Sequence, residues 1–333
     1  MVAKRIATIV GVFGSLLAVV MLLAPLVGST HISLLRVFDR SIPFADNVDA
    51  QIFFIARLPR VVAAAMVGAG LAAAGVVLQA LLRNPLASPE TLGVSMGASF
   101  GAMVAIVLLP SSRIASVSSI PLATLAGSLA ALGVVYLLSV ARSRGMSSTV
   151  LLLGGVVLTT FMGAMISFMQ YLADFTQTAR MMRWLMGSLD VGSYTPILLA
   201  LVPLTVSTIG YLMLPRTLDL MTLGPEAASA RGVDVARAER IALVSASLST
   251  GAAVSLAGPV AFIGIVVPHL VRLMIGADHR VVLPAAALFG AAFLIGCDLI
   301  ARTLFSPVEL PVGIVTAIIG GPFFLWLLLR RAR

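Results

Sequence analysis

Residues 61–82 read VVAAAMVGAGLAAAGVVLQALL, an unbroken apolar stretch with a single polar side chain, Gln79. About 20 predominantly apolar residues are enough for a helix to cross the hydrocarbon core of a bilayer. Small residues recur along the stretch at near-helical spacing, which lets neighbouring helices approach closely. They are Ala64, Gly68, Ala72 and Gly75. The stretch predicts a packed transmembrane helix whose Gln79 bonds to a neighbouring helix; the alternative is that Gln79 faces a transport pathway.

The composition of the whole chain also indicates a membrane protein. Of its 333 residues, 60% are apolar and 11% are charged, and the mean hydropathy is +1.10. A soluble domain has about 45–50% apolar and about 25% charged residues, so lipid must solvate much of this chain. The formal net charge is +9, but the basic residues lie in short gaps between apolar runs. That placement is typical of membrane topology and argues against nucleic-acid binding.

Ten apolar runs qualify as spans, and they predict an all-α integral membrane protein with a single transmembrane domain over residues 1–333. The runs are 6–28, 61–82, 92–109, 120–140, 149–172, 194–214, 241–257, 259–275, 281–300 and 311–329. The seventh and eighth are short and meet at Ala257-Gly258-Pro259, so they are either two helices or one broken pair. Membranes tolerate broken backbone only where protein buries its polar groups.

The distribution of basic residues predicts the orientation of the chain. With the N-terminus inside, 14 Lys and Arg residues fall on the cytoplasmic side and 8 on the outer side. This bias favours cytoplasmic positions for both termini, because basic loops are retained inside. The outer residues are all arginines, an excess that the positive-inside rule does not explain.

Features that catalysis would need are missing from the sequence. Lys4 is the only lysine, so no Walker A loop can place a lysine against ATP phosphates. The three histidines lack metal-ligand spacing, and Cys297 is the only cysteine. We therefore expect a chain that is not an enzyme and that binds no cofactor or metal of its own.

The polar segment 215–240 lies on the predicted cytoplasmic side and contains a helix signature. Glu226-Ala227-Ala228 is separated by three residues from Gly232. An acidic residue near a helix start, alanines within the helix and a glycine after its end favour one short amphipathic helix that turns sharply. Taken alone, the pattern predicts no more than a helix in a loop.

Three further groups of residues carry a resemblance to a known family. They are Arg57-Leu58-Pro59-Arg60 with Arg83-Asn84-Pro85-Leu86-Ala87-Ser88-Pro89, Gly258-Pro259-Val260-Ala261-Phe262-Ile263-Gly264 with Val267-Pro268-His269-Leu270-Val271-Arg272, and Glu309-Leu310-Pro311-Val312-Gly313. From about residue 55 to the C-terminus the chain resembles the permeases of ATP-binding cassette importers that carry ferric siderophores, haem or cobalamin. Residues 215–240 resemble their EAA loop, whereas residues 1–50 match only in forming a helix and an outer loop.

The resemblance implies a type II importer fold of about ten helices in the bacterial cytoplasmic (inner) membrane. It implies a second permease subunit, two cytoplasmic ATPase subunits that hold ATP and Mg²⁺, and a substrate-binding protein outside. Because the EAA loop of this family docks on the ATPase, the resemblance assigns coupling to Glu226, Ala227, Ala228 and Gly232. The identity of the chelate, and the choice between homodimer and heterodimer, do not follow from it.

The resemblance also assigns a cytoplasmic gate. The assigned residues are Asn84, Leu86, Ser147 and Ser148. Small polar residues can narrow a pathway without binding a polar cargo tightly. For Asn84 the alternative is an ordinary turn ahead of Pro85.

Docking of the substrate-binding protein is assigned to three of the outer arginines, Arg57, Arg60 and Arg302. A guanidinium offers a fixed fork of donors that suits carboxylates. The alternative is that these arginines reach to the membrane interface or cap helix ends. For Asp298, near the outer end of the ninth run, pairing with Arg302 at helical spacing is the simplest expectation.

The alternative function is a secondary transporter or channel driven by an ion gradient. Such proteins usually keep carboxylates or broken-helix ion sites near mid-membrane. Almost no carboxylate falls in the middle of a predicted span here, and the EAA pattern is present. We therefore favour an importer in which ATP binding by partner subunits opens and closes the inner face through residues 215–240.

Overall fold

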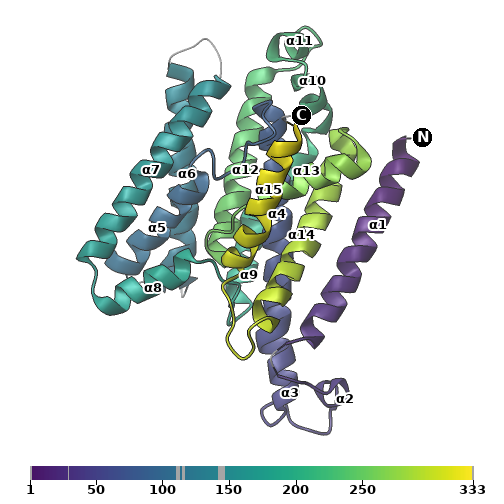
Figure 1. The fold of residues 1–333 in the computed structure, drawn as a ribbon, viewed down its shortest axis with the longest axis vertical. Helices are drawn as coiled ribbons and strands as arrows, with labels where there is room; N and C mark the ends of the chain where they lie inside the picture. Colours follow the sequence, from purple (N-terminus) through teal and green to yellow (C-terminus); the bar gives the residue numbers. More distant parts are fainter. Residues whose placement is uncertain (1, 29, 110–112, 115–116, 142–146, 332–333) are drawn as a thin grey trace.

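The structure is a computed structural model that describes residues 2–28, 30–109, 113–114, 117–141 and 147–331, and its long helices form a single bundle (Figure 1). These helices are α1 (Val2–Leu23), α4 (Leu58–Leu81), α5 (Val94–Leu108), α6 (Ser119–Ala141), α7 (Ser148–Leu172), α9 (Thr195–Leu212), α12 (Val235–Ala257), α13 (Ile263–Ile275), α14 (His279–Thr303) and α15 (Val312–Arg331).

Shorter elements connect these helices. They are the 3₁₀ turn η1 (Ala24–Leu26), α2 (Leu34–Val37), α3 (Val48–Gln51), the π-helical segment η2 (Ile52–Arg57), α8 (Phe175–Leu185), α10 (Pro215–Met221), α11 (Pro225–Ser229) and an antiparallel hairpin of β1 (Arg113–Ile114) and β2 (Val117–Ser118).

The predicted membrane architecture is confirmed. Within the described residues, seven helices are long and apolar enough to cross a membrane, and three shorter ones, in α5, α13 and α15, are also apolar. Each of the ten predicted runs overlaps one of these helices. The count of about ten spans is approximate, because α5 and α13, with 15 and 13 residues, fall below the length of a full crossing.

The seventh and eighth runs turn out to differ in kind. α12 is a full helix of 23 residues, whereas α13 has only 13. At about 1.5 Å per residue, α13 is roughly 20 Å long, short of the hydrocarbon thickness of about 30 Å. Between them, Gly258 and Phe262 adopt left-handed φ values of 66° and 68°, which break the helix. α13 therefore begins within the bundle, where neighbouring protein surrounds its first turn.

The α4 segment forms the centre of the bundle. Of its apolar window, 78% is buried, against 6% for α1, which lies at the edge. A Cβ at Gly68 would stand 2.2 Å from the carbonyl oxygen of Gly290 in α14, and one at Gly75 would stand 2.0 Å from that of Gly264 in α13. These distances leave no room for a side chain, so the small residues of α4 serve close helix packing, as predicted.

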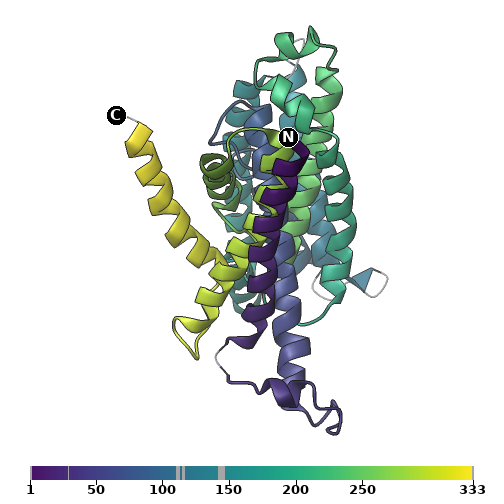
Figure 2. The same ribbon diagram turned by 90° about the vertical axis from the view of Figure 1, so that its right-hand side faces the viewer.

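The two ends of the bundle carry different connections. Both termini lie toward the end that bears α10 and α11, whereas α2 and α3 lie at the opposite end (Figure 1). This arrangement places the termini on the same side as residues 215–240. Figure 2 shows α15 leaning away from the other helices toward its C-terminal end.

Candidate functional site

The segment 215–240 forms two short helices rather than one. α10 begins at Pro215 and α11 at Pro225, each in the first turn, where a missing backbone N–H costs nothing. Gly224, with φ of 110°, separates them. The short helix predicted around Glu226 is therefore confirmed as α11, and α10 is an additional helix that precedes it.

α11 ends in a Schellman motif built around Gly232. The backbone N–H of Val233 donates to the carbonyl oxygen of Ala228 at 3.2 Å, and that of Gly232 donates to Ser229 at 2.9 Å. Gly232 has φ of 82°, in the left-handed region that favours glycine. The sharp turn predicted at this glycine is confirmed. Ala228 is fully buried, whereas Glu226 is exposed.

α10 and α11 connect an exposed surface to a membrane helix. Leu223, between them, is 61% exposed, which is high for a leucine in a polar segment. From α10, the Asp219 carboxylate Oδ1 lies 2.6 Å from Nδ1 of His279 and accepts the His279 backbone N–H at 3.1 Å. Since His279 is the first residue of α14, Asp219 links α10 directly to the start of that helix.

The connection after α4 contains the first predicted gate segment. The Asn84 side-chain Oδ1 accepts the backbone N–H of Leu86 at 2.9 Å, so Asn84 does form a turn around Pro85. Leu86 is 37% exposed. The turn is thus observed, and a gating role for these two residues stays a prediction.

The second predicted gate segment lies at the start of α7. Ser147 caps this helix, its Oγ accepting the backbone N–H of Val150 at 3.4 Å. Ser148 lines a small cavity of about 20 Å³ together with Arg83 and with Pro225 of α11. The structure therefore brings one predicted gate segment next to the predicted coupling segment.

Two of the three outer arginines are buried against backbone oxygens at the end of α1. Arg57, 6% exposed, donates to the carbonyl oxygens of Pro25, at 3.0 Å, and of Thr30. Arg302, 3% exposed, donates to that of Ala24 at 2.7 Å. These contacts fix the turn after α1 to α4 and α14, as the helix-capping alternative anticipated.

The third arginine, Arg60, belongs to an ion-pair cluster. Its Nε donates to Asp298 at 2.8 Å and its Nη1 donates to Glu309, which is half-exposed. The fully buried Asp298 also lies 3.7 Å from Arg302, so the pairing expected at helical spacing is confirmed. The bond to Arg60, which is 238 residues away in sequence, could not be predicted from local spacing.

Gln79 bonds to a neighbouring helix, as expected. Its Nε2 donates to the carbonyl oxygen of Gly264 at 3.1 Å, and the Arg272 guanidinium donates to its Oε1. Both partners belong to α13. The single polar side chain of the α4 stretch therefore holds the short helix in place and does not face a pathway.

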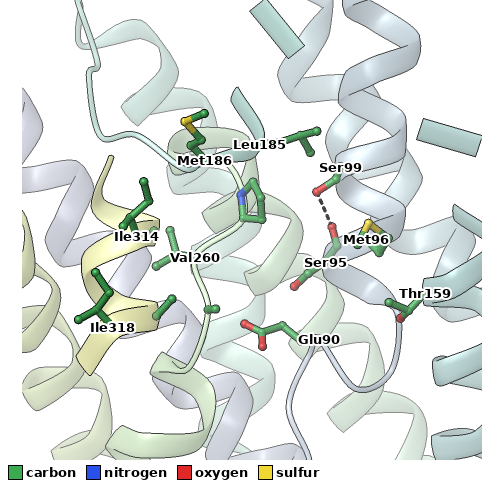
Figure 3. A pocket seen from close by; sticks show the side chains of 14 residues that line it. Glu90, Ser95, Met96, Ser99, Thr159, Leu185, Met186, Val260, Ile314 and Ile318 are labelled. Atoms are coloured by element: carbon green, nitrogen blue, oxygen red, sulfur yellow. Dashed lines mark hydrogen bonds between the residues drawn. The ribbon is translucent and has the colours of Figure 1, made fainter. Parts of the chain in front are cut away.

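A cavity of about 640 Å³ within the bundle contains the side chain of Glu90 (Figure 3). Its walls come from α5, α7, α8, the segment between α12 and α13, and α15. Glu90 projects into it from the connection between α4 and α5. Sequence reasoning missed Glu90, because a glutamate in a polar connection gives no signal that the connection folds inward.

The fold defines a multi-pass α-helical membrane protein that carries the short helices α10 and α11 at one end. The chain belongs to the FecCD transport family, whose sequence profile matches residues 16–330. The match begins within α1, so the likeness extends well beyond the start near residue 55 that was expected.

Individual relatives agree with this assignment. The chain is 39% identical over 322 residues to the hemin transport system permease protein HmuU of Yersinia pestis, covering 96% of this chain and 95% of that one. It is 44% identical over 275 residues to the cobalamin import system permease protein BtuC of Halobacterium salinarum, covering 83% and 72%. A solved structure described as an inward-facing metal-chelate type ABC transporter superposes with a TM-score of 0.83 at 32% identity, covering 97% and 99%.

Proposed function

We propose that this chain is the membrane-spanning subunit of an ATP-binding cassette importer and that it moves a metal chelate across the membrane by alternating access. Two separate ATPase subunits supply the energy, and a second permease subunit completes the pathway. The observation that carries the proposal is the family match over residues 16–330 combined with an exposed, glycine-terminated EAA helix. The relatives named for hemin, cobalamin and iron chelatin support a chelate as cargo.

Glu90 is an acidic residue inside the bundle, a feature that also suits a transporter driven by an ion gradient. The energy source for transport therefore needs a direct test. We expect uptake of iron chelate or cobalamin into proteoliposomes to require ATP. It should fall to background when the Walker lysine of the partner ATPase is replaced. A proton or sodium ionophore serves as the control and should leave uptake unchanged. Uptake that survives the lysine variant but stops with the ionophore would favour the secondary transporter.

Movement of the coupling segment supplies the mechanism for the inner gate. Glu226 and Leu223 are exposed for contact with an ATPase, while Asp219 is bonded to the start of α14 and Pro225 lies beside Ser148. A displacement of α10 and α11 on ATP binding therefore reaches both α14 and the start of α7. Closure of the gate by Asn84, Leu86, Ser147 and Ser148 follows in this proposal.

Docking of an acidic substrate-binding protein centres on Arg60. Arg57 and Arg302 are enclosed by the chain itself, which leaves them to support the site, whereas Glu309 on the partly exposed side of Arg60 can be exchanged for a carboxylate of the partner. Because such an exchange replaces one carboxylate on Arg60 by another, the guanidinium keeps an ion-pair partner throughout.

Glu309→Gln should therefore speed association with the binding protein a few-fold at low salt, because it removes a competitor and frees the Arg60 guanidinium for the partner. The rate can be measured with purified binding protein and permease in nanodiscs. Asp46→Asn, which removes the same charge from an exposed site between α2 and α3, is the matched control. The gain should vanish at about 1 M salt, where the Debye length is about 3 Å. An unchanged or slower rate for Glu309→Gln would exclude this exchange.

A further inference from the structure

Glu90 is an isolated carboxyl group in the cavity between α5, α7, α8 and α15. It is the only titratable residue among the fourteen that line the cavity. No side chain among the described lining residues carries a positive charge, and the walls are mainly apolar, including Met96, Leu185 and Ile314. Figure 3 shows the carboxylate directed at the open space between α5 and the 259–261 segment.

Contacts of its neighbours place Glu90 well below the surface of the bundle. A Cβ at Gly155 would stand 2.3 Å from the carbonyl oxygen of Thr91, so the residue after Glu90 packs directly on α7. Gly155 lies seven residues into α7, which corresponds to a depth of about 10 Å. On the other side, Pro89 lies 3.3 Å from the Cβ position of Gly264 in the first turn of α13. The connection therefore dips into the bundle, which membranes tolerate only where it lines a cavity or is covered by protein.

The other polar groups of the cavity wall are neutral. Ser99 uses its Oγ to donate to the backbone oxygen of Ser95 at 3.0 Å. The buried Oγ1 of Thr159, at the edge of the cavity, has no hydrogen-bond partner within the described part of the chain. A polar group that is buried without a hydrogen-bond partner lowers the stability of the fold unless a ligand or water supplies the partner. The cavity is thus shaped to receive something that brings donors with it.

We propose that this cavity is a selectivity site on the transport path, in which Glu90 favours chelates that present a positive or hydrogen-bond-donating group and disfavours chelates with outward-facing carboxylates. The inference rests on the proposed importer function, because it concerns the cargo of that pathway. It assigns the cargo to a chemical class, amine- or amide-bearing chelates, that the family match leaves open.

The physical basis is the weak screening of charge inside the bundle. Between unit charges the Coulomb energy scales inversely with the local dielectric constant, so Glu90 in its ionised form acts far more strongly in an apolar cavity than a carboxylate in water. A cationic group of the cargo favours that ionised form, and a carboxylate of the cargo opposes it. A carboxylate on the chelate is repelled by Glu90. The described lining residues include no cation that would offset this repulsion. Discrimination of this kind arises from the unfavourable contact with the wrong ligand as much as from the contact with the right one.

The charge preference can be measured without knowing the cargo. Ser95→Cys places a thiol on the cavity wall, and Cys297→Ala removes the native cysteine, which is buried in α14. The full permease with its ATPase subunits in nanodiscs is then labelled with a cationic and an anionic methanethiosulfonate reagent of similar size. We compare the ratio of the cationic to the anionic labelling rate. We expect this ratio to be at least about tenfold higher for the Ser95→Cys thiol than for a free thiol in solution. Glu90→Gln should return the ratio to that of the free thiol.

Asp190→Asn serves as the control for general surface charge, because Asp190 is exposed and follows α8 near the cavity. It should leave the labelling ratio unchanged. A labelling ratio that Glu90→Gln also leaves unchanged, or a cysteine that neither reagent reaches, would overturn the proposal. Importer function is scored separately by ATP-driven uptake, so a failure there is distinguishable from a failure of charge selection.

The cargo class is tested by protection of the same cysteine. Ferrioxamine B, a hydroxamate chelate with a free amine, should slow labelling, whereas ferric citrate, a carboxylate chelate, should not. In the Glu90→Gln variant this difference should disappear. Protection by neither chelate, equal protection by both, or stronger protection by ferric citrate would refute the assigned class.

Discussion

Gly232→Val reduces transport-coupled ATP hydrolysis by about tenfold while the membrane helices stay folded; this is the result we expect from the turn after α11. Gly232 has φ of 82°, and a β-branched residue in this left-handed region costs about 1–2 kcal/mol. Apart from its chain neighbours, no heavy atom of the described residues lies within 4 Å of the position where its Cβ would stand, so the effect is on the backbone and not on packing. An altered turn changes the orientation of α11 and the position of Glu226, which the ATPase is proposed to contact.

The backbone origin of this effect can be isolated with two further variants. Gly232→Asn should retain most of the coupling, because asparagine tolerates the left-handed region better than other non-glycine residues. Gly192→Val is the matched control, since Gly192 is exposed, has an ordinary φ and also has open space at its Cβ position. The measurement is ATP hydrolysis stimulated by loaded binding protein. Normal coupling in the double variant Glu226→Ala, Gly232→Val would remove the claim that this helix transmits the signal.

Local pattern was enough to predict the helices and several of their contacts. The run 61–82 was recognisable by length and composition, and the small residues within it predicted close helix packing, which the structure shows against α13 and α14. The turn at Gly232 followed from the chemistry of helix ends, and the pairing of Asp298 with Arg302 followed from helical spacing. Each of these depends on residues within a few positions of one another.

Contacts between distant segments could not be predicted. Arg60 reaches Asp298 and Glu309 only because α4 and α14 pack side by side. Its role as an internal ion-pair partner could therefore not be recognised from the sequence. Glu90 looked like part of a surface connection, since sequence gives no measure of how far a loop folds inward. The docking arginines remain a prediction, although burial of Arg57 and Arg302 shifts the exposed part of that site to Arg60.

The ion-pair cluster leads to the second large effect, on stability. Asp298 is fully buried between Arg60 and Arg302, whose side chains are 11% and 3% exposed. Asp298→Ala removes the shared carboxylate and leaves two largely buried guanidinium groups facing one another. Breaking a buried pair by removing one partner costs about 3–5 kcal/mol, because the remaining charge is uncompensated. We expect the variant to unfold at a markedly lower temperature than the parent in the same detergent or nanodisc.

Three comparisons separate this electrostatic loss from simple loss of packing. Glu309→Gln removes the half-exposed partner of the same Arg60, and should cost no more than about 1 kcal/mol. Asp298→Asn keeps a hydrogen-bond acceptor for Arg60 and should fall between the two. Asp298→Ala combined with Arg302→Leu should recover part of the loss, because one buried charge is then replaced by an apolar side chain. Equal destabilisation by Asp298→Ala and Glu309→Gln would mean that the cluster is solvated and that Asp298 does not hold α14 to α4.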